Sequence, residues 1–240
     1  MPKSISVIMP AFNVAAYIDD ALQSILQQHY DPLQLIVVDD GSTDTTSGIV
    51  ETYRHQFGDR LKYIYQDNSG VSRARNVGLM HARSELIAFL DGDDVWPKDV
   101  LTRHANFLKA NPHAHAVMGL VSSFADRSFP FEALDAQEFS EPYFVGQVGT
   151  VLMHSRVLDI VGNFDESLTT GEDADWFLRI KQKGLPIGRT DALSLYYRIR
   201  KGSLMRRETA SQNELVLKIL KKSVERQRQT QTAETGAQPR

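Results

Sequence analysis

The sequence predicts an α/β fold built on a mainly parallel central sheet. Over the first hundred residues, short apolar runs rich in β-forming residues alternate with segments whose apolar residues recur at helical spacing. Such alternation is typical of βαβ units, whose strands run parallel. The apolar runs lack polar alternation, as expected of strands that are buried on both faces. The 240 residues suffice for one large domain with a hydrophobic core.

The first half of the chain is expected to hold four strands and four helices. The strands are predicted at 5–9, 33–38, 61–65 and 85–90, and the helices at 14–28, 42–55, 71–82 and 97–110. Ser42 or Thr43 is the expected N-cap of the second helix, and Ser69 that of the third. Pro97 suits the first turn of the fourth helix.

The second half of the chain is less regular. Residues 122–143 lack a helical period and contain two prolines, which predicts a long connection, and such connections are often functional. Further elements follow, namely a strand at 149–154, helices at 155–162 and 172–184, and a strand at 193–199. A basic amphipathic helix is expected at 209–228 and a disordered tail at 229–240.

Composition excludes several classes of protein. The net charge of −3 favours neither nucleic acid nor a membrane surface as a general partner. The chain has no cysteine, so disulfides and thiolate metal sites are excluded. No apolar run approaches the roughly 20 residues that span a bilayer, and the N-terminus does not resemble a signal peptide. These features predict a cytoplasmic protein that binds no nucleic acid.

Polar residues follow three of the predicted strands. They are Pro10 to Asn13, Asp39 to Ser42, and Asp91 to Asp94. Parallel strands bring their carboxyl ends to one edge of the sheet, where ligands bind in open α/β folds. Any one cluster alone is explained by a turn or a helix cap. Two acidic clusters at one edge repel each other, which costs electrostatic free energy. A bound divalent cation, which also takes phosphate oxygens as ligands, removes that cost.

The chain has neither a P-loop nor a dinucleotide-binding glycine motif. Five segments instead resemble, in order and spacing, the family 2 glycosyltransferases with the GT-A fold: VIMPAFNVAAYIDDALQSIL, IVVDDGSTDTT, SGVSRARNVGL, IAFLDGDDVW and VGNFDESLTTGEDADWFLRI. The resemblance implies a Rossmann-like α/β/α sandwich whose acceptor side is mixed. The GT-A domain is then expected at 1–208, with a nucleotide-binding half at about 1–120 and an acceptor-side half at about 121–208.

The resemblance implies an enzyme that transfers a sugar from a nucleoside diphosphate donor, with UDP the expected nucleotide, and inverts the anomeric carbon. Phe12 matches the aromatic residue that packs on the base, although a core position is an equal alternative. Asp40 matches the carboxylate that accepts from the base, while Asp39 orients the turn. Pro10 and Asn13 belong to the same nucleotide-sugar site.

Asp91 and Asp93 match the family's D-x-D motif, which implies Mg²⁺ or Mn²⁺ as the cofactor. Asp93 is the expected direct metal ligand, and Asp91 is expected to contact the metal, its water, the ribose or the sugar. Asp94 is expected to cap the next helix. Arg75 either reaches the diphosphate or sugar, or pairs with Asp91.

The catalytic base is predicted by helical spacing as well as by the resemblance. Asp173 falls near the middle of an apolar helix face that Trp176 and Phe177 help to define, whereas Glu172 falls at its edge. An acid in the first turn also suits the helix dipole, but that role does not explain its inward direction. Both acids are candidate catalytic residues, and Asp173 is the expected general base.

The sequence departs from the family near its last strand. Many relatives carry a histidine two residues after the position of Arg198, where this chain has Arg200. Arginine does not bind metal, but it holds phosphate through a bidentate fork. Arg198, Arg200 and Lys201 are therefore candidate diphosphate ligands, with a solvated basic run as the alternative. Bound to the diphosphate, these residues would take over part of the metal's role.

Other classes of protein share parts of this pattern. A sugar-1-phosphate nucleotidyltransferase and a non-catalytic nucleotide-sugar-binding protein are the principal alternatives. The expected acceptor is a saccharide or a lipid-linked saccharide. The C-terminal helix is expected to dock on the domain or on a twin subunit in a homodimer. Its alternative partner is the inner face of a membrane.

Overall fold

The computed structural model describes residues 2–125, 139–200, 217–226 and 228. Its centre is a seven-stranded sheet with the order β3-β2-β1-β4-β6-β5-β7. The strands are β1 (Ile5–Ala11), β2 (Leu33–Asp39), β3 (Leu61–Tyr65), β4 (Leu86–Phe89), β5 (Ala116–Ala125), β6 (Val151–His154) and β7 (Ile187–Ile199). The first four strands are parallel, as the alternating pattern predicted.

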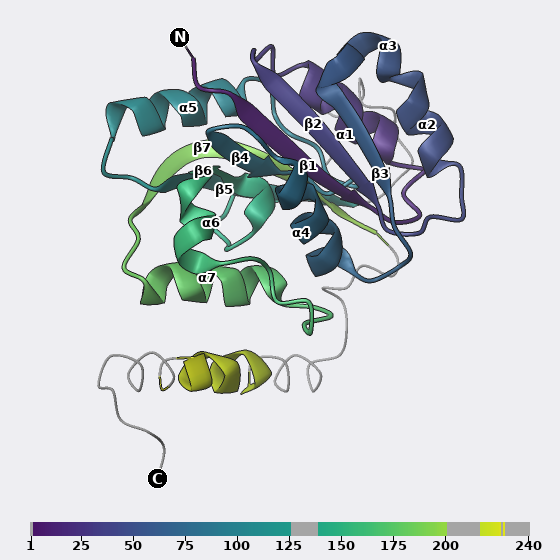
Figure 1. Ribbon diagram of the computed structural model, residues 1–240. Coiled ribbons are helices and arrows are strands. Elements are labelled where there is room, and N and C mark those ends of the chain that lie inside the picture. Colours follow the sequence, from purple (N-terminus) through teal and green to yellow (C-terminus); the bar gives the residue numbers. More distant parts are fainter. Residues whose placement is uncertain (1, 126–138, 201–216, 227, 229–240) are drawn as a thin grey trace.

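Helices cover both faces of this sheet (Figure 1). They are α1 (Ile18–Leu26), α2 (Thr46–Thr52), α3 (Arg54–Phe57), α4 (Val71–His81), α5 (Val100–Ala110), α6 (Arg156–Val161) and α7 (Glu172–Gln182), with short 3₁₀ turns at Gly58–Arg60 and Val148–Thr150. One buried core joins the sheet to α1, α2, α3 and α5, and a second joins its other face to α4, α6 and α7. The architecture is the predicted α/β/α sandwich.

The second half of the sheet is mixed, because β6 runs antiparallel to both β4 and β5, while β5 and β7 are parallel. Strand β5 was not predicted from the sequence, and its last residues fall in the predicted connection at 122–143. The strand continues through two polar residues whose hydroxyls are satisfied internally. Ser122 donates to the Ser140 carbonyl at 2.7 Å, and Ser123 bonds to the Tyr143 hydroxyl at 2.8 Å. Strand β7 also begins earlier than predicted.

Helix starts were predicted less well than helix positions. The second predicted helix begins at Thr46, with Thr45 at its N-cap, and it is interrupted before α3. Gly70 rather than Ser69 lies at the N-cap of α4. The helix predicted to start beside Pro97 begins at Val100 instead. Local hydrogen bonding by polar residues competes for these positions, so that composition alone does not fix the first helical residue.

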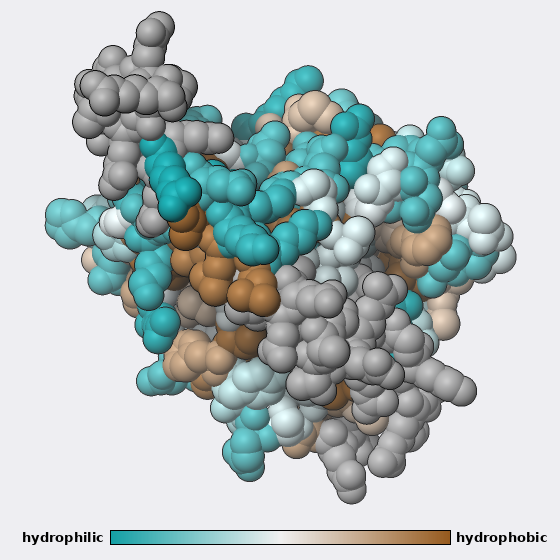
Figure 2. Space-filling model, turned by 90° about the horizontal axis from the view of Figure 1, so that it is seen from below, coloured by the Kyte–Doolittle hydropathy of each residue, from teal (hydrophilic) through white to brown (hydrophobic). Residues whose placement is uncertain are grey.

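Residues 217–226 form a helix that lies against α7 (Figure 1). Ile219 is buried, and Arg226 pairs with Asp175 at 2.5 Å. The exposed side of this helix contributes to a face of the molecule on which hydrophobic side chains gather (Figure 2). The rest of the predicted 209–228 helix and the predicted tail lie outside the described residues. Within the described part of the chain, no helix is long and apolar enough to cross a membrane.

Candidate active site

The three polar segments lie together at one edge of the sheet. Ala11 at the end of β1 is paired with Asp39 at the end of β2. The Asp40 amide donates to the Ala11 carbonyl at 2.8 Å, and the Gly92 amide donates to the Pro10 carbonyl at 3.2 Å. The parallel strands thus deliver the carboxylates that follow them to a common edge, as expected from the sequence.

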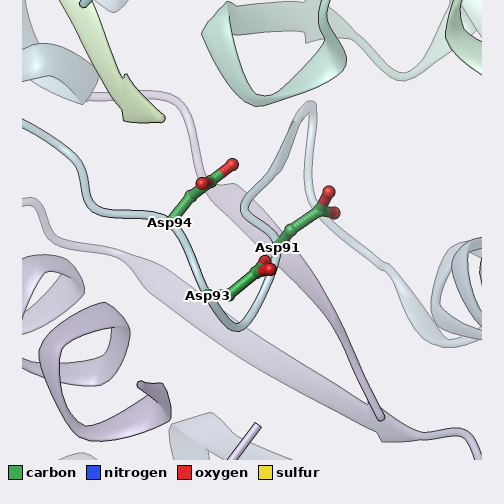
Figure 3. Close-up of side chains that lie close together, drawn as sticks. All are labelled: Asp91, Asp93 and Asp94. Carbon is green, nitrogen blue, oxygen red and sulfur yellow. The ribbon is translucent and has the colours of Figure 1, made fainter. Parts of the chain in front are cut away.

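Asp91, Asp93 and Asp94 extend from one tight loop after β4 (Figure 3). Each offers a carboxylate oxygen, and these oxygens lie within 4.8 Å of one another. Burial raises the pKa of Asp93, and the charge of Asp91 raises it further against the opposing effect of Arg200. Burial and the two neighbouring carboxylates also raise the pKa of Asp94 well above its usual range. The loop therefore concentrates negative charge where water solvates it poorly.

These residues fit a hard divalent cation. Mg²⁺ and Mn²⁺ take carboxylate oxygens, and a cation would offset the repulsion that raises the pKa of Asp93. Asp91 and Asp93 would hold the ion. Asp94 is less available, because its Oδ1 accepts the Arg198 amide at 2.9 Å and its side chain is buried. The expectation that Asp94 caps the next helix is wrong, because Asp99 lies at the N-cap of α5.

Arg75 of α4 joins this acidic loop to helix α7. Its Nη2 contacts both Asp91 carboxylate oxygens, at 2.9 and 3.1 Å. Its Nη1 contacts Glu172 at 3.0 Å and Asp173 at 2.9 Å. Burial lowers the pKa of Arg75, but the three carboxylates outweigh that effect and raise it. Of the two alternatives for Arg75, the structure contains the ion pair with Asp91.

Asp173 lies in a setting suited to a general base. One oxygen accepts from Arg75, and the other accepts the Val148 amide at 3.0 Å. Burial raises the pKa of Asp173, Arg75 lowers it, and Glu172 and Asp91 raise it, to a net value of about 6. A base whose pKa lies just below the working pH is mostly unprotonated and still accepts a proton readily.

Arg198 and Arg200 do not form a solvated basic run. Arg198 is buried, with its guanidinium 4.7 Å from the centre of the Phe124 ring and an ion pair to Asp20 at 2.7 Å. Arg200 is more exposed, and its Nε lies 2.7 Å from Asp93. Arg200, which stands where the resemblance predicts a histidine, thus pairs with the expected metal ligand. Lys201 lies outside the described residues.

The end of β2 positions the loop before α4. Asp40 accepts from the Gln66 side chain and from the Ser69 and Gly70 amides, at 2.7 to 2.8 Å. Asp39 accepts the Ser42 amide at 2.7 Å and thus orients the turn as expected. Because a carboxylate accepts about four hydrogen bonds, Asp40 has little capacity left for a nucleotide base.

Phe12 lies at the end of β1 with 45% of its surface exposed, so the alternative of a core position is wrong. Asn13 follows it with a positive φ of 50°. The Asn13 side-chain oxygen accepts the Thr43 amide at 2.8 Å and thus ties the ends of β1 and β2 together. Pro10 is buried within β1. An exposed aromatic ring beside a polar loop suits stacking on a ligand.

Two residues of the site, Asp20 and Val148, were not predicted from the sequence. Asp20 lies on the buried side of α1 together with Ile18 and Ser24, and an acid on such a face was the available signal. Val148 contributes only its backbone amide to Asp173, and side-chain chemistry carries no signal for such a contact.

Comparison with known proteins identifies the family. The model of the family described as "Glycosyl transferase family 2" matches residues 6–210. The chain belongs to glycosyl transferase family 2. The predicted resemblance is thereby confirmed, and the chain is a member of a family of enzymes.

Several curated proteins are similar to this family 2 chain. The putative teichuronic acid biosynthesis glycosyltransferase TuaG of Bacillus subtilis is 38% identical over 116 residues, which cover 48% of this chain and 46% of TuaG. The minor teichoic acid biosynthesis protein GgaB of the same species is 28% identical over 220 residues, or 87% of this chain and 24% of GgaB. An uncharacterised glycosyltransferase of Rickettsia prowazekii is 30% identical over 186 residues, which cover 72% of this chain and 57% of that protein. The chain therefore spans less than half the length of TuaG and of GgaB.

Solved structures share the fold. S. aureus TarS 1–349 in complex with UDP-GlcNAc matches with a TM-score of 0.70 and 26% identity, over 85% of this chain and 61% of that chain. A second match is mannosyltransferase PcManGT from Pyrobaculum calidifontis in complex with GDP-Man and Mn²⁺. It has a TM-score of 0.68 and 22% identity, over 94% of this chain and 65% of that chain. Family and neighbours confirm the predicted GT-A fold.

Replacement of Arg200 by alanine is expected to strengthen Mn²⁺ binding by roughly three- to tenfold, because Asp93 loses a competing cation at 2.7 Å. Mn²⁺ titration followed by calorimetry or electron paramagnetic resonance measures the change. Arg54→Ala, which breaks the exposed pair with Glu51, is the matched control and should leave the affinity unchanged. Weaker Mn²⁺ binding by Arg200→Ala would instead mean that Arg200 holds the acidic loop in its binding geometry.

Asp173→Asn is expected to stabilise the fold at neutral pH. The folded-state pKa of about 6 exceeds the unfolded value of about 3.9, so the folded protein binds the proton more tightly. The free energy of unfolding therefore falls as pH rises from about 4 to 6, by a total of about 3 kcal/mol. Asparagine removes this cost, so its advantage in urea denaturation should be largest at pH 7.5 and about half as large at pH 5.

Asp165→Asn is the control with the opposite sign. Hydrogen bonds from Lys222 and Ser167 outweigh burial and lower the pKa of Asp165 to about 2, so its charge stabilises the folded state at neutral pH. This variant should unfold at lower urea than the parent at pH 7.5. An Asp173→Asn variant that is destabilised to the same extent would show that the charged Asp173 contributes net stability.

Proposed function

We propose that the protein transfers a sugar from a nucleoside diphosphate donor to an acceptor hydroxyl, with inversion, during synthesis of a cell-wall polymer. The observation that carries the proposal is Asp173, a carboxylate with a raised pKa that Arg75 joins to the acidic loop after β4. The teichuronic and teichoic acid names of two relatives support the polymer class. UDP is the proposed nucleotide, since TarS binds UDP and UDP-GlcNAc at 26–27% identity.

In this mechanism Asp173 accepts the proton of the acceptor hydroxyl while that oxygen attacks the anomeric carbon. The bond between the anomeric carbon and the diphosphate oxygen breaks at the same time, and the nucleoside diphosphate departs with the electron pair. Arg75 and the Val148 amide each bond to one Asp173 oxygen. They fix the carboxylate plane and leave lone pairs on both oxygens for the acceptor.

The residues after β1, β2 and β4 form the donor half of the proposed site. Phe12 packs on the base, and Asn13 and Asp40 order the loops around it. A divalent cation, when bound, would supply positive charge to the departing diphosphate. Asp91 and Asp93 would hold it, and Arg200, beside Asp93, is placed to contribute charge to the same diphosphate.

A non-catalytic binding protein would have no use for a partly buried carboxylate whose pKa is raised at the acceptor side of a donor site. Such a carboxylate lowers stability at neutral pH, as the pKa of Asp173 shows. Family membership likewise gives no support to a nucleotidyltransferase. We therefore retain the glycosyltransferase proposal alone.

Asp173→Asn is expected to reduce sugar transfer by roughly 10²-fold or more, because the variant keeps the shape of the side chain but not its basic oxygen. Donor affinity, measured by calorimetry with UDP and Mn²⁺, should change little. Transfer by the parent should be lost as pH falls through about 6, since the base must be unprotonated. Turnover is measured as UDP release from a panel of donors, with and without saccharide acceptors.

Glu172→Gln is the matched control for this test. Glu172 contacts the same Arg75 nitrogen and is similarly shielded from solvent, but the Val148 amide donates to Asp173 and not to Glu172. This variant should lose less activity than Asp173→Asn. Normal transfer by Asp173→Asn, with an inactive Glu172→Gln, would assign the base to Glu172. Loss of UDP binding by Asp173→Asn would make its role structural.

A further inference from the structure

An open groove with a volume of about 370 Å³ lies between α7, the start of β7 and the segment before β6. This volume falls within the range of small-molecule sites. Its lining is mainly apolar and comes from four parts of the chain, since Met118 of β5 also contributes. Phe144, Phe177, Ile180 and Ile187 belong to the apolar lining.

Two cations are exposed at the rim of this groove. Lys181 lies near the end of α7, and Arg189 lies on β7 with its guanidinium 5.6 Å from the centre of the Phe144 ring. Among the residues that the structure describes, neither forms an ion pair with a carboxylate. The groove itself is lined by no acidic residue. An apolar channel with two unneutralised cations is complementary to an amphiphile that carries an anionic group.

The groove runs along α7, beginning one helical turn after Asp173. Phe177 lines the groove and lies one helical turn after Asp173 on α7, about 6 Å along the axis. On the opposite wall, Gly146 precedes by two residues the Val148 amide that binds Asp173. Lys181 lies about 12 Å along the helix from Asp173. A molecule that extends from the proposed base along α7 would pass Phe177, enter the groove and approach the two cations.

We propose that this groove binds the acceptor, and that the acceptor is an amphiphile with an anionic group. Its apolar part packs on Phe177, Ile180 and Ile187, its anionic group lies between Lys181 and Arg189, and its hydroxyl reaches Asp173. This inference rests on the proposed function and adds the chemical class of the acceptor. A neutral saccharide would satisfy neither the apolar lining nor the two cations.

Calorimetry with octyl phosphate, below its micellar concentration, tests the groove without a known acceptor. The parent protein is expected to bind about one molecule, and to bind octyl glucoside and inorganic phosphate at least tenfold more weakly. Hexyl phosphate should also bind more weakly, by up to roughly fourfold for each methylene that the groove buries. Equal affinity for the octyl and hexyl compounds would show that only charge is recognised and would overturn the proposal.

Variants locate the binding. Lys181→Gln and Arg189→Gln should each weaken octyl phosphate binding by up to about fivefold, the usual range for exposed ion pairs, and leave octyl glucoside binding unchanged. Lys183→Gln is the matched control, because Lys183 is exposed at the end of the same helix but does not line the groove. Equal effects of the three substitutions would place the ligand elsewhere and overturn the assignment.

The two proposals can fail separately. If the parent does not bind octyl phosphate but Asp173→Asn still abolishes UDP release from the donor, the groove assignment is wrong and the glycosyltransferase proposal stands. If octyl phosphate binds in the groove while Asp173→Asn turns over normally, the groove is a site of amphiphile binding without the proposed base, and the acceptor role is overturned.

Discussion

The Arg75 guanidinium contacts three carboxylates that come from two distant parts of the chain, and only 2% of its side chain is exposed. Asp91 follows β4, whereas Glu172 and Asp173 begin α7, about eighty residues later. A buried ion pair is weak evidence for stability, because desolvation offsets much of its attraction. The role of the Arg75 ion pairs here is to fix the geometry of the site. The guanidinium places the proposed base beside the acidic loop at a fixed distance.

The surrounding fold holds Arg75 in place. Asp40 accepts hydrogen bonds from the amides of Ser69 and Gly70 and so fixes the start of α4. On the other side, the Phe164 ring packs on the guanidinium at 5.4 Å. Burial raises the pKa of Asp173, and because one cation faces three acids, the charges of Glu172 and Asp91 raise it further. Functional sites often retain unfavourable charge of this kind because the chemistry uses it.

Much of this arrangement follows from the sequence. Strand and helix periodicity predicted the parallel half of the sheet and hence the common edge where Asp39 and Asp91 lie. Spacing along α7 pointed Asp173 inward. What periodicity did not predict depends on tertiary contacts. Strand β5 continues through Ser122 because a distant carbonyl satisfies its hydroxyl, and Asp94 binds the Arg198 amide more than a hundred residues away. Neither partner is visible in a local pattern.

The pKa of Asp173 in the Asp91→Asn variant tests the central claim most directly. If Arg75 couples the two halves of the site, loss of the Asp91 charge leaves the guanidinium less neutralised and removes a repelling carboxylate. Carbon-13 NMR titration of aspartate carboxyls, with Asp173 assigned by its absence in Asp173→Asn, measures the value. The account predicts a pKa clearly lower than the value of about 6 in the parent. An unchanged pKa would contradict it and would mean that the acidic loop and the base are electrostatically independent.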